Sequence, residues 1–111
     1  MRAIEKQIID VIDNALTGKP CNLWNVLSKR DTVNVKDSEI VVLLHGTDIV
    51  TIDREKMSLR LNHGGWTTVT TKSRMNAILS HLGLSTIYQK DFYWYMGVNG
   101  QPYKNGLTIK L

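Results

Sequence analysis

The sequence contains one cysteine, Cys21, so its 111 residues cannot form an internal disulfide. A reducing compartment is the expected setting. No apolar run approaches the roughly 18 residues that a transmembrane helix needs. Charged residues also interrupt the first 16 positions, where a signal peptide would carry an unbroken apolar core. With two prolines and no low-complexity segment, the chain is expected to form a single domain over residues 1–111, in the cytoplasm and away from the membrane.

The motifs of common enzyme classes are also absent. The sequence has no G-x-S-x-G, no G-x-x-x-x-G-K-[ST] and no H-E-x-x-H. Its three histidines are isolated from one another and offer no metal-ligand spacing. Cys21 follows a proline and precedes an apolar segment, which favours an inert thiol. We therefore expect no catalytic residue, no metal and no cofactor, and a protein that binds rather than catalyses.

Positive charge is concentrated in the last third of the chain. Residues 1–69 hold nine basic and nine acidic side chains, which cancel, whereas residues 70–111 hold five basic side chains against Asp91 alone. The whole net charge of +4 therefore arises after residue 69. Such a local excess can attract an anionic partner, or it can simply be a soluble face that carries lysines.

Hydrophobic periodicity predicts helices at three places. Residues 3–16 repeat apolar side chains at helical spacing, and Gly18 and Pro20 end the pattern. A short helix is expected at 23–29, capped by Asn22, with Leu23, Trp24 and Leu27 towards the core. The clearest helix begins at a cap on Thr70 or Thr71 and ends at Gly83. Its core-facing stripe consists of Met75, Ile78, Leu79 and Leu82.

A period of two replaces the helical period between residues 32 and 61. The segments TVNVK, EIVVLLH, DIVTI and MSLRLN are rich in β-branched or alternating residues and are joined by short turns. Such short connections allow only antiparallel pairing. Further strands are expected in TIYQKDFYWYM and LTIKL, with an Asn-Gly turn between them. The predicted fold class is α+β: an antiparallel meander with helices packed on one face and a C-terminal β-hairpin.

The best candidate site is the start of the helix after residue 69. A helix N-terminus has free N–H groups and favours anions, yet this one carries cations and no acid. We predict a phosphate or carboxylate site there. The alternative is that the two cations point away and pair with acids from residues 1–69. The candidate residues are Thr70, Thr71, Lys72, Ser73 and Arg74.

The second candidate is the aromatic segment YQKDFYWYM. Alternation predicts that Phe92 and Trp94 are buried, together with Trp66, and that Tyr93 and Tyr95 face outward near Lys90. Exposed tyrosines beside a lysine suit base stacking or the anchoring of a protein partner. The alternative is an ordinary strand whose aromatic residues form cross-strand pairs.

A run of residues between 43 and 96 resembles small tailed-bacteriophage proteins of uncharacterised function. Its most specific part is G-W-x-T-x-T-T-K-x-R-x-N, from Gly65 to Asn76, followed by Gly83-Leu84 and Tyr88-Gln89-Lys90. The resemblance implies a phage accessory protein made in a bacterial host cell, and it implies no mechanism. Proteins of that kind are often host-takeover or anti-defence factors.

These observations together predict a non-enzymatic binding protein of phage accessory type. The first hypothesis is contact with nucleic acid, or another phosphate ligand, through the basic helix start, extended by Lys90, Tyr93 and Tyr95. The alternative is an anti-CRISPR-like inhibitor directed at a host or defence protein. A third option, sequestering a small nucleotide, requires a defined pocket. The sequence leaves the partner and the oligomeric state open.

Overall fold

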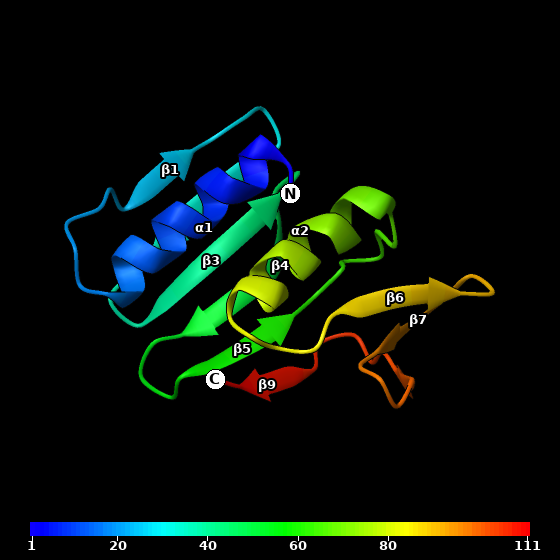
Figure 1. Cartoon of the computed structure of the whole chain (residues 1–111). Coiled ribbons are helices and arrows are strands. Elements are labelled where there is room, and N and C mark those ends of the chain that lie inside the picture. The colour runs from blue at the N-terminus through cyan, green and yellow to red at the C-terminus, as the bar shows by residue number, and fades with distance from the viewer.

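The computed structural model describes residues 1–111 and contains two helices and nine strands. Figure 1 shows their arrangement. The helices are α1 (Ala3–Leu16) and α2 (Val69–His81). The strands are β1 (Trp24–Val26), β2 (Asp31–Val35), β3 (Glu39–Leu44), β4 (Thr47–Asp53), β5 (Ser58–Leu61), β6 (Ile87–Lys90), β7 (Tyr93–Met96), β8 (Gln101–Pro102) and β9 (Thr108–Lys110).

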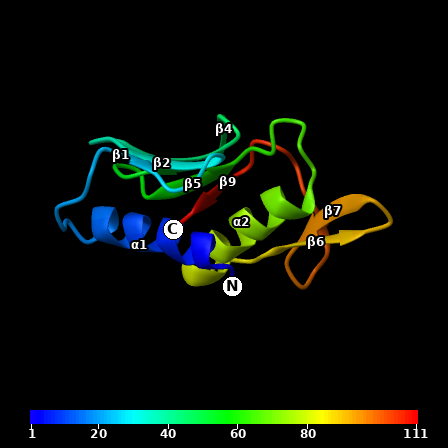
Figure 2. The ribbon, with the colours of Figure 1, turned by 90° about the horizontal axis from the view of Figure 1, so that it is seen from above.

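Six strands form the main sheet, in the order β1-β2-β3-β4-β5-β9, with every pair antiparallel. The first five follow one another along the chain, and β2 to β5 form the predicted meander. Alternate residues of these strands point to the same face, so β2 buries Asp31, Val33 and Val35 and leaves the two residues between them half-buried. Figure 2 shows α1 and α2 lying side by side on that one face. The predicted α+β class is confirmed.

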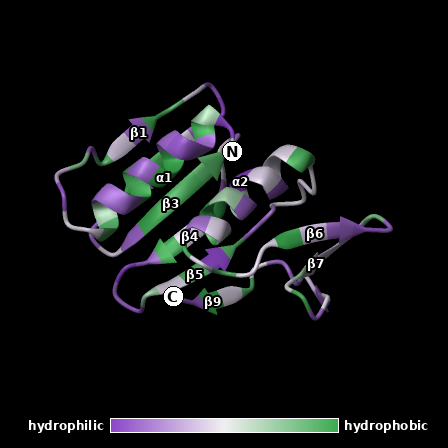
Figure 3. Cartoon of the chain, viewed as in Figure 1, coloured by the Kyte–Doolittle hydropathy of each residue, from purple (hydrophilic) through white to green (hydrophobic).

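The core lies between the two helices and the main sheet. Ile8 and Ile12 of α1 and Met75, Ile78 and Leu79 of α2 are at most 2% exposed. The polar residues of α1 face away from the sheet, and β3 is strongly apolar along its length (Figure 3). The predicted core stripe of α2 is confirmed for three of its four members, while Leu82, beyond the end of α2, is half-buried.

The other three strands form a small sheet in the order β6-β7-β8, which extends beyond the end of the main sheet (Figure 2). The side chain of Asn76 in α2 holds it: its amide nitrogen donates to the Ile87 carbonyl at 2.8 Å, and its oxygen accepts from the Ile87 N–H at 2.7 Å. The chain then returns, and β9 pairs with β5 in the main sheet. The last strand, β9, therefore pairs with the main sheet and is not part of the predicted C-terminal hairpin.

The helix expected at 23–29 is wrong. This segment contains β1, an edge strand that pairs with β2, and Leu23 and Trp24 are more than half exposed. Seven residues are too few to hold a helix without tertiary support, and pairing with β2 satisfies the same backbone groups. Leu27 alone of the three expected residues packs against the core.

Candidate functional site

The helix α2 begins two or three residues earlier than the sequence indicates. Thr68 is the N-cap, and its hydroxyl accepts from the Thr71 N–H at 3.2 Å. The side chains of Thr68 and Thr71 also hydrogen-bond each other at 3.0 Å. The earlier start places Arg74 in the second turn and leaves Lys72 as the single cation of the first turn.

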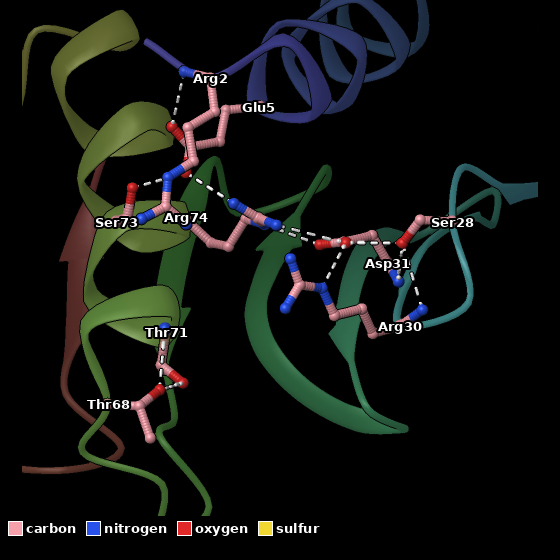
Figure 4. A network of polar contacts seen from close by, with 9 residues as sticks. All are labelled: Arg2, Glu5, Ser28, Arg30, Asp31, Thr68, Thr71, Ser73 and Arg74. Carbon is pink, nitrogen blue, oxygen red and sulfur yellow. Dashed lines mark hydrogen bonds and ion pairs between the residues drawn. The ribbon is translucent and has the colours of Figure 1, made fainter.

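Arg74 is the centre of a buried ion network between the two helices and the sheet (Figure 4). Its side chain is 1% exposed. Its Nη1 donates to Glu5 of α1 at 2.8 Å, and its Nε donates to Asp31 of β2 at 2.7 Å. Ser73 also donates to Glu5, at 2.6 Å, and Ser28 donates to Asp31, at 2.8 Å. We call Arg74, Glu5 and Asp31 the buried triad.

The buried triad is charged, and its hydrogen bonds keep it so. Burial acts to raise the pKa of Glu5, but hydrogen bonds from Ser73 and Arg74 outweigh it, and the pKa lies below its ordinary value. Burial opposes the charged form of Asp31 too, and the hydrogen bonds from Arg74 and Ser28 again lower the pKa. The same contacts raise the pKa of Arg74, although burial acts against its charge.

The prediction that Arg74 presents its charge to a ligand is therefore wrong. The alternative interpretation describes this residue correctly, since its partners are acids from the first 69 residues. Thr71 is buried and bonded to the cap, and the hydroxyl of Ser73 serves Glu5. These three candidate residues hold the fold together, whereas Thr70 and Lys72 remain half-buried at the surface.

The buried triad also makes the rest of the protein more basic. One arginine buried with two acids has a net charge of −1, whereas the whole chain has +4. All other residues together therefore carry +5. Lys72, Lys90 and Lys104 in the last third have no acidic side chain within ion-pair distance.

A cavity of about 420 Å³ lies at the start of α2. Four threonines contribute to its wall, so we call it the threonine cavity. Its lining residues are Arg30, Leu44, His45, Thr47, Ile49, His63, Trp66, Thr68, Thr70 and Thr71. It is thus formed by three segments that are far apart in sequence: the β1–β2 turn, the β3–β4 turn with its flanking strand ends, and the continuous stretch from His63 to the first turn of α2.

Local irregularities of the chain shape this cavity. The register between β3 and β4 shifts after Val42, so that both Ile49 and Val50 are buried and Ile49 reaches the cavity. Gly64 packs its Cα against Thr47, where any side chain would collide. The N–H of His45, in the turn, donates to the Arg30 carbonyl at 2.8 Å. These contacts hold the cavity wall in place without a ligand.

The threonine cavity collects hydrogen-bond donors that the fold does not use. The Arg30 guanidinium makes no hydrogen bond, and its nearest acid, Asp31, lies 3.8 Å away. It extends towards α2 in Figure 4. The Thr70 hydroxyl has no partner, and the N–H group of Thr70 precedes the first intrahelical bond. Free donors of this kind match an anion such as phosphate.

His63 adds a neutral ring to the same cavity. Its Nδ1 accepts from the Gly65 N–H at 2.9 Å, which assigns the ring proton to Nε2. Burial lowers the pKa of His63, which favours the uncharged form of the ring. His63 also contacts Trp94 edge to face, with the ring centroids 5.6 Å apart.

A second cavity of about 290 Å³ lies beside the small sheet, and His63 lines it too. Aromatic rings dominate its wall, so we call it the aromatic hollow. Its lining residues are His63, Thr67, Phe92, Tyr93, Trp94, Tyr95, Pro102 and Tyr103. Because the two cavities share His63, they form neighbouring parts of one surface.

The structure brings Lys90, Tyr93 and Tyr95 to one face of the small sheet, as alternation predicts. Lys90 pairs with Tyr93, and Tyr95 pairs with Tyr88, whose ring stacks on it with centroids 5.7 Å apart. Tyr93 is 71% exposed and Tyr95 is half-buried. Lys72 lies apart from them on α2, with its Nζ 3.5 Å from the Gln89 side chain.

Two of the three predictions of aromatic burial are wrong. Trp94 is buried at 7% exposure, but Trp66 is 60% exposed and Phe92 is 93% exposed. Phe92 occupies the second position of the two-residue turn between β6 and β7, after Asp91, and both have positive φ. A turn residue leaves the alternation of the strand, which is why the pattern misplaced Phe92.

Sequence reasoning missed Arg30, His45 and His63 as site residues. His45 was assigned to the end of the strand segment EIVVLLH, and the run from Asn62 to Gly65 was identified only as a turn, although turns often carry functional side chains. Their convergence depends on the register of β3 with β4, which the sequence does not specify. Nowhere do three or more His, Cys, Asp or Glu side chains come together as a metal site, and neither helix is long and apolar enough to cross a membrane.

Comparison with known families gives a match over nearly the whole chain. The family described as Kyanoviridae Gp96 protein matches residues 1–110. The chain therefore belongs to this family of phage proteins. No curated protein and no solved structure matches it.

Proposed function

We propose that this member of the Kyanoviridae Gp96 family is a non-enzymatic phage accessory protein that binds the phosphate groups of a nucleic acid in the threonine cavity. The observation that carries the proposal is that Arg30, whose side chain makes no hydrogen bond and only a long ion pair of 3.8 Å with Asp31, lines the same cavity as Thr70, whose N–H is free. A phosphate there would accept from a cation and from a helix N-terminus at once.

The charge distribution supports a polyanion rather than a single phosphate. The surface outside the buried triad carries +5, and Lys72, Lys90 and Lys104 are not neutralised by neighbouring acids. A strand that docks one phosphate in the threonine cavity would meet these lysines with others. Nucleic acid binding is driven largely by such phosphate contacts.

The test is the salt dependence of affinity for a fluorescent single-stranded oligonucleotide. Wild-type protein should bind at low salt and weaken steeply as salt rises. Arg30→Gln should weaken binding and reduce the slope of log K against log salt by about 0.7, the value for one lost contact on a single strand. Lys19→Gln, which removes one exposed charge near the end of α1, is the matched control and should leave the slope unchanged.

Equal effects of the two substitutions would contradict a localised site and indicate only a general charge attraction. A mononucleotide that competes at micromolar concentration would assign the threonine cavity to a small nucleotide instead of a strand. Absence of any binding at low salt would refute the proposal.

A second candidate function is supported by the exposed apolar side chains of the small sheet. Phe92 is 93% exposed, Tyr93 71%, and Val98 is fully exposed at the next turn. Such side chains serve as anchors in protein interfaces, so an inhibitor of a host or defence protein would bind through them. Capture of a host protein that survives nuclease and high salt, and that is lost in Tyr93→Ala, would favour this function over nucleic acid binding.

A further inference from the structure

We infer that the aromatic hollow is a binding slot for a base of single-stranded nucleic acid, with Phe92 as one of its stacking walls. The inference rests on the proposed function, which places the phosphate backbone of the same strand in the threonine cavity. Three independent features of the hollow support it.

The first feature is the composition of the hollow. Four aromatic residues, Phe92, Tyr93, Trp94 and Tyr103, contribute to the lining of a space of about 290 Å³. Trp94 and Tyr103 contact each other edge to face, with centroids 5.3 Å apart, so their positions are fixed by packing. Bases stack on aromatic rings with little regard to sequence, because every base has a π-face.

The second feature is a buried donor without a partner in one of the residues that line the hollow. Trp94 is buried, and its indole Nε1 is the one buried side-chain nitrogen or oxygen in the protein without a hydrogen-bond partner. Buried indole N–H groups normally find an acceptor. A base offers ring nitrogens and carbonyl oxygens that accept hydrogen bonds, and a purely apolar ligand does not.

The third feature is the conformation of Phe92. Its φ of 72° lies in the left-handed region, where glycine is favoured and an aromatic residue is unusual. The ring gains no burial in return, since Phe92 is 93% exposed. Neither folding nor turn geometry explains a phenylalanine here, so its role lies outside the fold.

The position of the hollow selects a strand as the ligand. His63 lines both the threonine cavity and the aromatic hollow, so a phosphate in one and a base in the other belong to neighbouring sites. In a duplex the bases are stacked and paired, and a base reaches such a hollow only after it is flipped out. A single strand offers its bases without that cost, and Lys90 beside the Phe92 turn is placed to meet its backbone.

The test compares an oligothymidylate of about 15 nucleotides with an abasic strand of equal length, which keeps the phosphates and lacks the bases. Wild-type protein should bind the oligothymidylate at least tenfold more tightly. Phe92→Gly should weaken oligothymidylate binding about tenfold and leave the abasic affinity unchanged. Its melting temperature should be equal or raised, because glycine suits a positive φ. Phe92→Trp should retain binding, because it keeps an aromatic ring in the same turn.

Met57→Gly provides the matched control. Met57 also has a positive φ, of 51°, and is 45% exposed, but it lies in the β4–β5 turn, at the other end of the molecule from the small sheet (Figure 1). This substitution should stabilise the protein and change neither affinity.

The outcomes separate this inference from the proposed function. If wild-type protein binds both strands equally and Arg30→Gln weakens both, the phosphate site stands and the base slot is refuted. Wild-type affinity for oligothymidylate in Phe92→Gly also refutes the base slot. So does a Phe92→Trp variant that binds the abasic strand normally but loses both its affinity for oligothymidylate and its capture of a host protein. If wild-type protein binds neither strand at low salt, both proposals fail.

Discussion

The main sheet and the small sheet use their large apolar residues in opposite ways. On the main sheet, Val33, Ile40, Val50 and Leu59 are completely buried beneath the helices. The small sheet contributes only Ile87 and Trp94 to the core, while Tyr88, Phe92, Tyr93 and Val98 are exposed. Burial therefore accounts for the sequence of β2 to β5 of the main sheet and leaves that of the small sheet unexplained, which directs the search for binding residues to the latter.

The two sheets also differ in how they are attached. The main sheet is covered by both helices and tied to them through the buried triad. The small sheet depends on the reciprocal bonds between Asn76 and Ile87 and on the packing of Trp94. Substitutions that disrupt the buried triad should therefore unfold the protein, whereas substitutions that disrupt the contacts of Asn76 or Trp94 should detach only the small sheet.

The largest effect is expected for Arg74→Met. Removing the cation leaves Glu5 and Asp31 buried without a counter-charge, which should lower the free energy of unfolding by about 3–5 kcal/mol. Urea denaturation measures it, with Lys72→Met, two residues away, as a control that should change stability by less than about 0.5 kcal/mol. If the free energy of unfolding fell by a similarly small amount in both variants, the buried triad would not be what ties the helices to the main sheet.

The next largest effect is expected for Leu79→Ala, which should lower the free energy of unfolding by about 2–5 kcal/mol. The reason is that Leu79 is fully buried between α2 and the main sheet. Tyr93→Ala, on the exposed face of the small sheet, should be nearly neutral in the same denaturation experiment. A loss below about 1 kcal/mol in Leu79→Ala would contradict the assigned face of α2.

Acid should weaken the main body through the same triad. The pKa values of Glu5 and Asp31 lie below their ordinary values of 4.5 and 3.8, so the folded state binds their protons less tightly than the unfolded state does. The resulting stability is present above those ordinary values and is lost as the pH falls through the lowered ones. The melting temperature should therefore drop below about pH 4.5. Glu5→Gln should flatten the drop, whereas the exposed Glu55→Gln should preserve it.

The smallest and most local effect is expected for Asn76→Ala. It removes both bonds to the Ile87 backbone, at a cost of about 1–3 kcal/mol. Hydrogen exchange should accelerate for amides of β6 and β7 and stay unchanged in β2 to β4. Asn34→Ala, on the open face of the main sheet, is the control. Uniform acceleration across both sheets would mean that the small sheet is not a separate unit.

The sequence predicted those parts of the fold whose signals are local. The helical stripe of residues 3–16 coincides with α1, and the alternation from residue 32 onwards yields β2 to β5. The segment of β1 was misassigned because its strand exists only through pairing with β2. The start of α2 was placed late because Thr68, Thr70 and Thr71 all resemble caps, and only the folded chain selects one.

The candidate site depended on long-range contacts to a greater degree. Arg74 lies 69 residues from Glu5 and 43 from Asp31, and no spacing rule connects residues so far apart. The threonine cavity likewise needs Arg30, His45 and Trp66 from three separate segments. Lys90, Tyr93 and Tyr95 were placed correctly on one face because the period of a strand is enough to do so.

The buried triad constrains the order in which the parts of the chain can pack together during synthesis. Glu5 and Asp31 are synthesised well before Arg74, and a carboxylate without its partner resists burial. The hairpins between β2 and β5 join neighbours in sequence and can form early, but α1 cannot dock on them in its final position. A nascent chain that ends at His63 should therefore carry an assembled meander and an undocked first helix, which closes over the sheet only once the second helix has emerged.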